Sequence, residues 1–168
     1  MQHTITRRIC VSALFAALIY VFTAFLHVPS YNGYTHIGDG FIFLAASLLP
    51  APYAMAASVI GAGLSDILSG YTLWFPGTAV IKALTALCFT AKNEKILCKR
   101  NLLGLIPALV LCAGGYYLYN ALVISRSFAA PLAEIPGNLI QWALSSVVYV
   151  VLGKLLDSAK LKNRLGAI

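Results

Sequence analysis

The chain has 168 residues, of which 60% are hydrophobic and only 10% are charged, whereas about 25% of the residues of an average soluble domain are charged. We therefore do not expect a water-soluble domain. The mean hydropathy of +0.85 indicates an integral membrane protein instead. The formal net charge is +7, but the basic residues lie in short clusters between apolar runs, which argues against a nucleic-acid partner.

The length limits the function as well. At roughly 20 residues for each spanning helix, residues 1–168 have room for about six helices in one membrane-embedded domain, and no nucleotide-binding domain fits. The sequence has no phosphate-binding motif of the G-x-x-x-x-G-K-[ST] kind, so any ATPase that drives it is another chain. We expect neither enzymatic activity nor a cofactor, and we interpret the four cysteines, which form no C-x-x-C pair, as reduced.

Six apolar runs follow one another along the chain, and each predicts a helix. The first follows Arg7 and Arg8 and has no cleavage-type site followed by a polar mature chain, so we interpret it as a retained helix. The second is short, because the ten residues from Gly40 span only about 15 Å at 1.5 Å per residue. It either begins as early as His36 or forms a re-entrant hairpin with the third. The runs cover residues 9–27, 40–49, 53–67, 76–91, 102–124 and 136–156.

The basic residues give the orientation. If the chain crosses the membrane six times, ten of its twelve basic residues lie on one side: Arg7, Arg8, Lys92, Lys95, Lys99, Arg100, Lys154, Lys160, Lys162 and Arg164. The positive-inside rule makes that side the cytoplasm. We therefore predict an all-α integral membrane bundle of six transmembrane helices with both termini in the cytoplasm. A re-entrant hairpin would remove an even number of crossings and leave this orientation unchanged.

With this orientation, the unusual polar residues lie in the outer half. Asp39 opens the second run, Asp66 closes the third, and Lys82 lies about two turns into the fourth. The other candidates for a binding site come from the outer connectors and from the outer ends of the last two helices: Asn32, His36, Tyr71, Trp74, Asn120, Asn138 and Gln141. This distribution predicts an outward-facing pocket with aromatic walls and a few polar groups.

Some of these residues have alternative interpretations. An ionisable group within the bilayer costs about 2.5–3.5 kcal/mol on insertion scales, so Asp66 and Lys82 need partners and can form a purely structural ion pair. Tyr71 and Trp74 can be anchors at the membrane interface. His36 and Asp39 are three residues apart and can be metal ligands on one helical face, but the sequence offers no clear third ligand.

The first helix has one face of small residues. Ala13, Ala17, Tyr20 and Ala24 lie at i, i+4, i+7 and i+11, which allows another helix to approach closely. That helix belongs either to the same bundle or to a partner protein.

Four short motifs occur together in this sequence: an N-terminal Arg-Arg followed by residues 13–17, the His-x-Gly-Asp stretch 36–39, the segment 66–71 and Pro76 six residues before Lys82. In this combination the chain resembles the substrate-binding S components of energy-coupling factor (ECF) vitamin transporters. The resemblance covers essentially the whole chain and is closest to the branch around the riboflavin, pyridoxine and hydroxymethylpyrimidine S components.

The resemblance implies a multi-pass protein of the cell membrane that captures a micronutrient from outside with high affinity. It also implies two kinds of partner, a transmembrane coupling subunit and two cytoplasmic ATPases. In the family the small residues of the first helix dock the coupling subunit, which here corresponds to Ala13 and Ala17. The cargo is then a small heteroaromatic compound: a vitamin B6 or pyrimidine precursor, or a queuosine-type deazaguanine precursor.

Two other classes of function remain open from the sequence. A stand-alone secondary transporter with Asp66 as its proton site agrees with the size and low charge, although the internal repeat expected of such carriers is not visible. An intramembrane enzyme would use His36, Asp39 and Asp66 around a metal, but the sequence contains neither a G-x-S-G nor an H-E-x-x-H motif.

Overall fold

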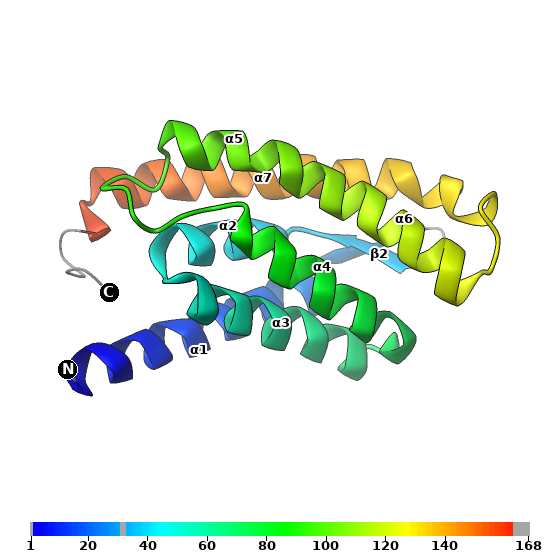
Figure 1. Cartoon of the computed structure of the whole chain (residues 1–168), viewed down its shortest axis with the longest axis horizontal. Coiled ribbons are helices and arrows are strands. Elements are labelled where there is room, and N and C mark those ends of the chain that lie inside the picture. The colour runs from blue at the N-terminus through cyan, green and yellow to red at the C-terminus, as the bar shows by residue number, and fades with distance from the viewer. Residues whose placement is uncertain (1, 31–32, 163–168) are drawn as a thin grey trace.

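The computed structural model describes residues 2–30 and 33–162, which are mostly helical (Figure 1). Its α-helices are α1 (Gln2–Ala24), α2 (Asp39–Leu48), α3 (Ala51–Leu68), α4 (Phe75–Leu87), α5 (Lys99–Val110), α6 (Tyr116–Tyr119) and α7 (Ile135–Ser158). Two short 3₁₀ segments, η1 (Thr72–Trp74) and η4 (Ala130–Glu134), precede α4 and α7. A π-helical segment, η2 (Leu111–Gly115), joins α5 to α6, and a second, η3 (Asn120–Ile124), follows α6. Together they form one continuous helix over residues 99–124.

Each of the six predicted runs contains a helix, but the helices differ in length. Four stretches are long and apolar enough to cross a membrane: Thr4–Ala24, Ala51–Leu68, Lys99–Ile124 and Ala130–Ser158. The helices of the second and fourth runs, Asp39–Leu48 and Thr72–Leu87, are shorter. Six helices are present in the described residues as predicted, but the helix of the second run has only ten residues, about half the length that a full crossing needs.

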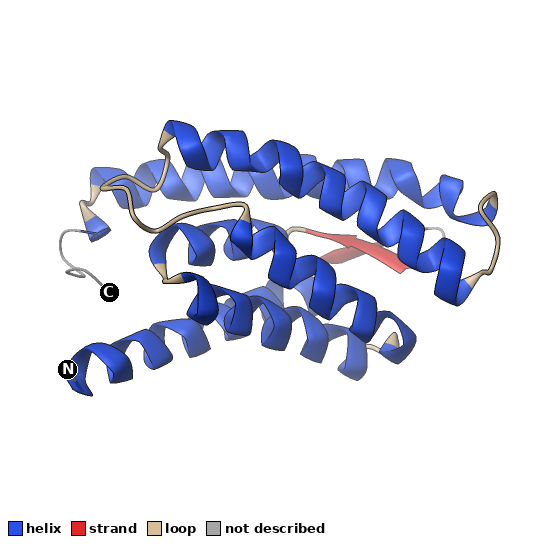
Figure 2. Ribbon diagram, viewed as in Figure 1, coloured by secondary structure: helices blue, strands red, loops and turns tan. Residues whose placement is uncertain are grey.

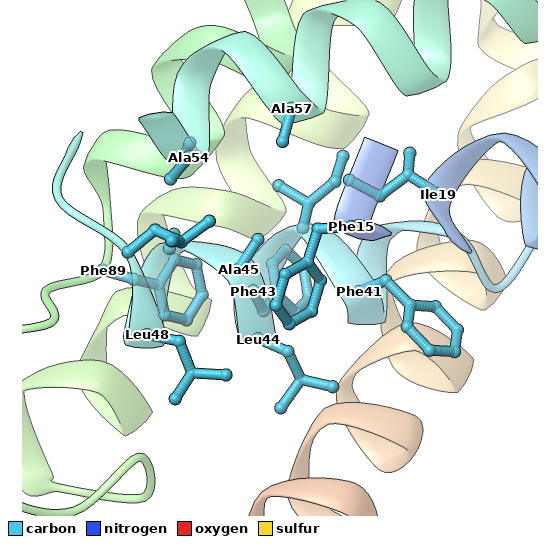
Figure 3. Packing of buried hydrophobic residues seen from close by; sticks show 14 of the residues in the cluster. Phe15, Ile19, Phe41, Phe43, Leu44, Ala45, Leu48, Ala54, Ala57 and Phe89 are labelled. Atoms are coloured by element: carbon cyan, nitrogen blue, oxygen red, sulfur yellow. The ribbon is translucent and has the colours of Figure 1, made fainter. Parts of the chain in front are cut away.

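The short helix α2 lies at the centre of the molecule. All ten of its residues are buried, and it contacts α1, α3, α4 and α7. Its sequence is apolar on every side, as expected of a helix enclosed by others. Figure 3 shows its side chains packed among those of neighbouring segments: Phe41, Phe43, Leu44, Ala45 and Leu48 with Phe15, Ile19, Ala54, Ala57 and Phe89.

Close helix approach in this bundle depends on small residues. Gly61 of α3 faces α1, where a Cβ atom would lie 2.5 Å from the carbonyl oxygen of Ala16 and 2.8 Å from the Cβ of Ile19. Any side chain at position 61 would therefore push α1 and α3 apart. Ala13 and Ala17, in contrast, are exposed on α1, so neither of these alanines is buried in the packing of the chain itself.

A β-hairpin, which the sequence analysis did not predict, precedes α2 (Figure 2). Strand β1 (His27–Ser30) pairs in antiparallel fashion with β2 (Gly33–His36), with His27 opposite His36 and Val28 opposite Thr35. In the sequence this stretch is part of the polar, aromatic connector between the first two apolar runs, and it contains Pro29. Proline is tolerated here because β1 has a partner on one side only.

The two ends of the bundle differ in charge. The start of α1, the end of α7 and the loop 88–98 lie together at one end, which we call the basic end (Figure 1). The hairpin, η1 and the loop 125–129 lie at the other, which we call the hairpin end. Arg7, Arg8, the cluster over residues 92–100 and Lys154 belong to the segments of the basic end, so the predicted clustering of basic residues is present in space.

Buried polar side chains fix the loop 88–98 at the basic end. The amide nitrogen of Asn101 lies 3.0 Å from the carbonyl oxygens of Thr90 and Ile96 and 3.1 Å from Ser47 Oγ, and its amide oxygen accepts a hydrogen bond from Thr90 N. The Asp157 carboxylate accepts hydrogen bonds from the backbone N–H groups of Ile96 and Leu97. The loop is thus tied to α2, α5 and α7.

Candidate functional site

A pocket of about 530 Å³, including its open mouth, lies at the hairpin end. Side chains from the hairpin, α3, the segment around η1, α4, α6, η4 and α7 line it: Tyr34, His36, Asp66, Tyr71, Trp74, Thr78, Tyr116, Glu134, Asn138 and Gln141. Residues far apart in the sequence therefore converge on one cavity.

Local structure explains how the aromatic walls arise. Tyr34 and His36 alternate along β2 and so share one face of the strand. The ring centroid of Tyr34 lies 5.0 Å from that of Tyr71 in an edge-to-face arrangement. The ring of Trp74 lies 6.1 Å from that of Tyr116. The pocket thus has two aromatic pairs, one contributed mainly by the hairpin and one by η1 and α6.

Asp66, in the last turn of α3, is bonded to the hairpin. Tyr34 donates a hydrogen bond of 2.9 Å to Asp66 Oδ1, and its hydroxyl also lies 3.2 Å from Ser65 Oγ. Burial raises the pKa of Tyr34 above its ordinary value, so the phenol stays protonated and acts as a donor. Asp66 is only 6% exposed, and Asp66 Oδ2 has no hydrogen-bond partner among the described residues.

Lys82 forms a buried ion pair with Asp39 at the base of the pocket. Its Nζ lies 2.7 and 2.8 Å from the two carboxylate oxygens, and the two side chains are 2% and 3% exposed. Gln141 Nε2 donates a further hydrogen bond of 3.0 Å to Asp39 Oδ2. The structural pair that we considered between Lys82 and Asp66 is therefore wrong: α2 brings Asp39 next to Lys82, while Asp66 contacts the hairpin.

His36 is neutral at physiological pH. Its Nδ1 accepts a hydrogen bond of 3.2 Å from the backbone N–H of Gly38, and burial lowers its pKa to about 4. The alternative in which His36 and Asp39 hold a metal has no third ligand, because in residues 2–30 and 33–162 no three His, Cys, Asp or Glu side chains form a group that could hold a metal ion.

Glu134 lines the pocket from η4 and connects it to a buried asparagine. Asn120 is 0% exposed, and its Nδ2 donates a hydrogen bond of 2.5 Å to Glu134 Oε1. The amide nitrogen of Asn120 is thereby oriented toward the carboxylate, and its Oδ1 is buried without a hydrogen-bond partner among the described residues.

The predicted site residues fall into four groups. Six of them line the pocket: His36, Asp66, Tyr71, Trp74, Asn138 and Gln141. Asp39 and Lys82 lie behind Gln141, and Asn120 lies behind Glu134. Asn32 lies outside the described residues. Ala13 and Ala17 are on the exposed surface of α1.

Four lining residues were absent from the predicted set: Tyr34, Thr78, Tyr116 and Glu134. Tyr34 lies in the connector between the first two apolar runs, near the predicted residues Asn32 and His36. Tyr116 follows the Gly114-Gly115 pair within an apolar run, where nothing distinguishes it from a packing residue. Glu134 carried a detectable signal, since it is one of only five acidic residues in the chain and lies in a segment that the orientation places outside.

Comparison with known protein families gives one match. A family model described as the S component of an ECF-type riboflavin transporter matches residues 3–158, which includes every residue that lines the pocket. No curated protein matches the chain.

Proposed function

This chain belongs to the S-component family of ECF-type riboflavin transporters, and from that membership we propose that it captures a small heteroaromatic micronutrient from outside the cell with high affinity. It is a multi-pass membrane protein of a transporter family, not of an enzyme family. The observation that carries the proposal is the pocket at the hairpin end, with four aromatic side chains around a few polar groups. The family description names riboflavin, and precursors of vitamin B6, pyrimidines or queuosine are further candidates.

The proposed orientation puts the hairpin end outside and the basic end in the cytoplasm. The gathering of basic residues at one end supports it, because cytoplasmic loops carry an excess of Lys and Arg. In this orientation the pocket opens away from the cytoplasm, as a capturing subunit requires. Residues 1–168 then form one membrane-embedded domain.

Within the pocket, we assign the polar contacts of the substrate to Asp66, Asn138 and Gln141. Tyr71 and Trp74 offer faces for stacking on a planar ring, and His36 presents a neutral imidazole. Asp39 and Lys82 would act on the substrate through Gln141 and Tyr116, because the charges of the pair are already bonded to each other. Asn120 would act through Glu134, and Asn32 remains a proposed contact from the sequence.

The proposed partners are a transmembrane coupling subunit and two cytoplasmic ATPase subunits. The face of α1 around Ala13 and Ala17 is the proposed docking surface. Both alanines are exposed, so a helix of the coupling subunit can approach them without unpacking the bundle.

The proposal is tested by purifying the chain and identifying any co-purified small molecule by mass spectrometry, followed by uptake assays in cells with and without an ECF module. We expect a heteroaromatic compound and uptake that depends on the module. Uptake without the module would instead support a stand-alone secondary transporter. Absence of any bound or transported heteroaromatic compound would contradict the proposal.

A further inference from the structure

Among the described residues, the pocket is lined by acidic side chains and by no basic one apart from a histidine. Its ten lining residues, all within the described part of the chain, include two carboxyl groups, Asp66 and Glu134, and no lysine or arginine. His36 adds no charge, because its Nδ1 accepts a hydrogen bond from Gly38 N and its burial disfavours protonation. An anionic ligand would therefore meet like charges in a region of low dielectric constant.

The nearest buried cation does not change this balance. Lys82 Nζ lies 5.0 Å from the ring centre of Tyr116, which lines the pocket. Its charge, however, is already matched by the two oxygens of Asp39 at 2.7 and 2.8 Å. A ligand that used Lys82 as its counter-ion would have to separate this buried pair, at a large energetic cost.

The unsatisfied groups of the site are acceptors. Asp66 Oδ2 lies in a pocket-lining side chain that is more than nine-tenths buried, and it has no hydrogen-bond partner among the described residues. Asn120 Oδ1, behind Glu134, is also buried without a partner there. Buried acceptors are costly to leave unpaired, so a ligand that donates hydrogen bonds to Asp66 gains more than one that accepts them.

The aromatic walls favour the same kind of ligand. The faces of Tyr and Trp rings attract cations, and they also stack on planar rings. Trp74 and Tyr116 line one part of the pocket, and Tyr34 and Tyr71 line another near Asp66. Negative charge, a buried acceptor and aromatic faces together are the features expected of a site for an organic cation.

We propose that this pocket selects a positively charged, nitrogen-containing heteroaromatic compound over neutral and anionic compounds with the same ring, and that Asp66 is the counter-ion. This inference rests on the proposed function, since it concerns the cargo of the same site. It goes further in assigning the cargo's charge.

Matched pairs of compounds test the proposal on the wild-type protein. In detergent at pH 7, affinities are measured by isothermal titration calorimetry for 7-aminomethyl- and 7-cyano-7-deazaguanine, for pyridoxamine and pyridoxine, and for riboflavin and its 5′-phosphate. In every pair with a member that binds, we expect the more positive member to bind at least about tenfold more tightly. Equal or tighter binding of the less positive member in any pair would overturn the inference but leave the proposed function intact, whereas no binding by any of the six would overturn the inference together with the riboflavin, vitamin B6 and queuosine-type candidates for the cargo.

Variants then test whether the two pocket carboxyl groups, Asp66 and Glu134, cause the selectivity for the cation. Asp66→Asn should weaken binding of the more positive member at least about tenfold and reduce its advantage over its matched partner. Glu134→Gln should act in the same direction and provides a second test if Asp66→Asn does not fold. The control is Glu94→Gln, which removes the same charge from an exposed position in the loop at the basic end and should leave both affinities unchanged. If both pocket variants keep the full advantage of the cation, the inference is wrong.

Discussion

Replacing Lys82 by methionine is expected to destabilise the protein by about 3–5 kcal/mol, because it leaves the Asp39 carboxylate uncompensated in the interior. The ammonium group now contacts both oxygens of that carboxylate, and Gln141 Nε2 would be the one side-chain donor left to it among the described residues. Asp39→Asn leaves a buried ammonium group instead and should be similarly destabilising. The double variant removes both charges and keeps an acceptor for Gln141, so it should be at least about 2 kcal/mol more stable than the sum of the single effects predicts.

Thermal unfolding in detergent, followed by circular dichroism, measures this cycle. For a chain of this size about 1 kcal/mol corresponds to roughly 2–4 °C in Tm, so each single variant should lower Tm by roughly 10 °C and the double variant by much less than the sum. Lys154→Met is the matched control, because it removes an exposed lysine from α7 and should change Tm little. Additive single effects, or a stable Lys82→Met variant, would refute the assignment of Lys82 and Asp39 as a buried pair.

Three further predictions concern the orientation, the docking face and the basic end. In a background without native cysteines, an impermeant thiol reagent added from outside should label a cysteine at Ser127 and not one at Asn93; the reverse pattern would invert the proposed orientation. The double variant Ala13→Trp and Ala17→Trp should fold and bind cargo normally, because both positions are exposed, but should lose uptake and co-purification with a coupling subunit; normal uptake would exclude this face as the docking surface. Asn101→Leu should lower Tm without changing affinity at the distant pocket, since each buried group left unpaired costs about 1–3 kcal/mol; an unchanged Tm would show that the loop 88–98 does not depend on this side chain.

The positions of the helices were predictable, because apolar runs bounded by Pro, Gly and charged residues are the strongest signal in such a sequence. The structure places a helix in each run, and most of the helix ends lie within three residues of the predicted ones. The hairpin was not predictable in the same way. Its strands have four residues each and no hydrophobic alternation. They pack against α1 and α7, and Tyr34 donates a hydrogen bond to Asp66 of α3. The sequence does not reveal these contacts between distant segments.

Most residues of the candidate site were predictable from the sequence, but which of their side chains form ion pairs or hydrogen bonds with each other was not. Membrane depth alone marked Asp39, Asp66 and Lys82 as unusual, since ionisable groups in a bilayer need partners. Which carboxylate meets Lys82 depends on how α2 is rotated and on how deeply it lies between α1, α3, α4 and α7. Hydrophobicity gives no indication of that rotation, because α2 is apolar on every side.

The enclosed helix α2 also connects the pocket to the basic end of the bundle. Its last turn is bonded to α5, the helix that follows the loop 88–98, through the hydrogen bond between Asn101 and Ser47. Its first residue, Asp39, accepts a hydrogen bond from Gln141, which lines the pocket. A helix of ten residues thus links the wall of the pocket to the segments of the basic end. In the proposed orientation this link, about 15 Å long, joins the outward-facing pocket to the cytoplasmic end of the bundle.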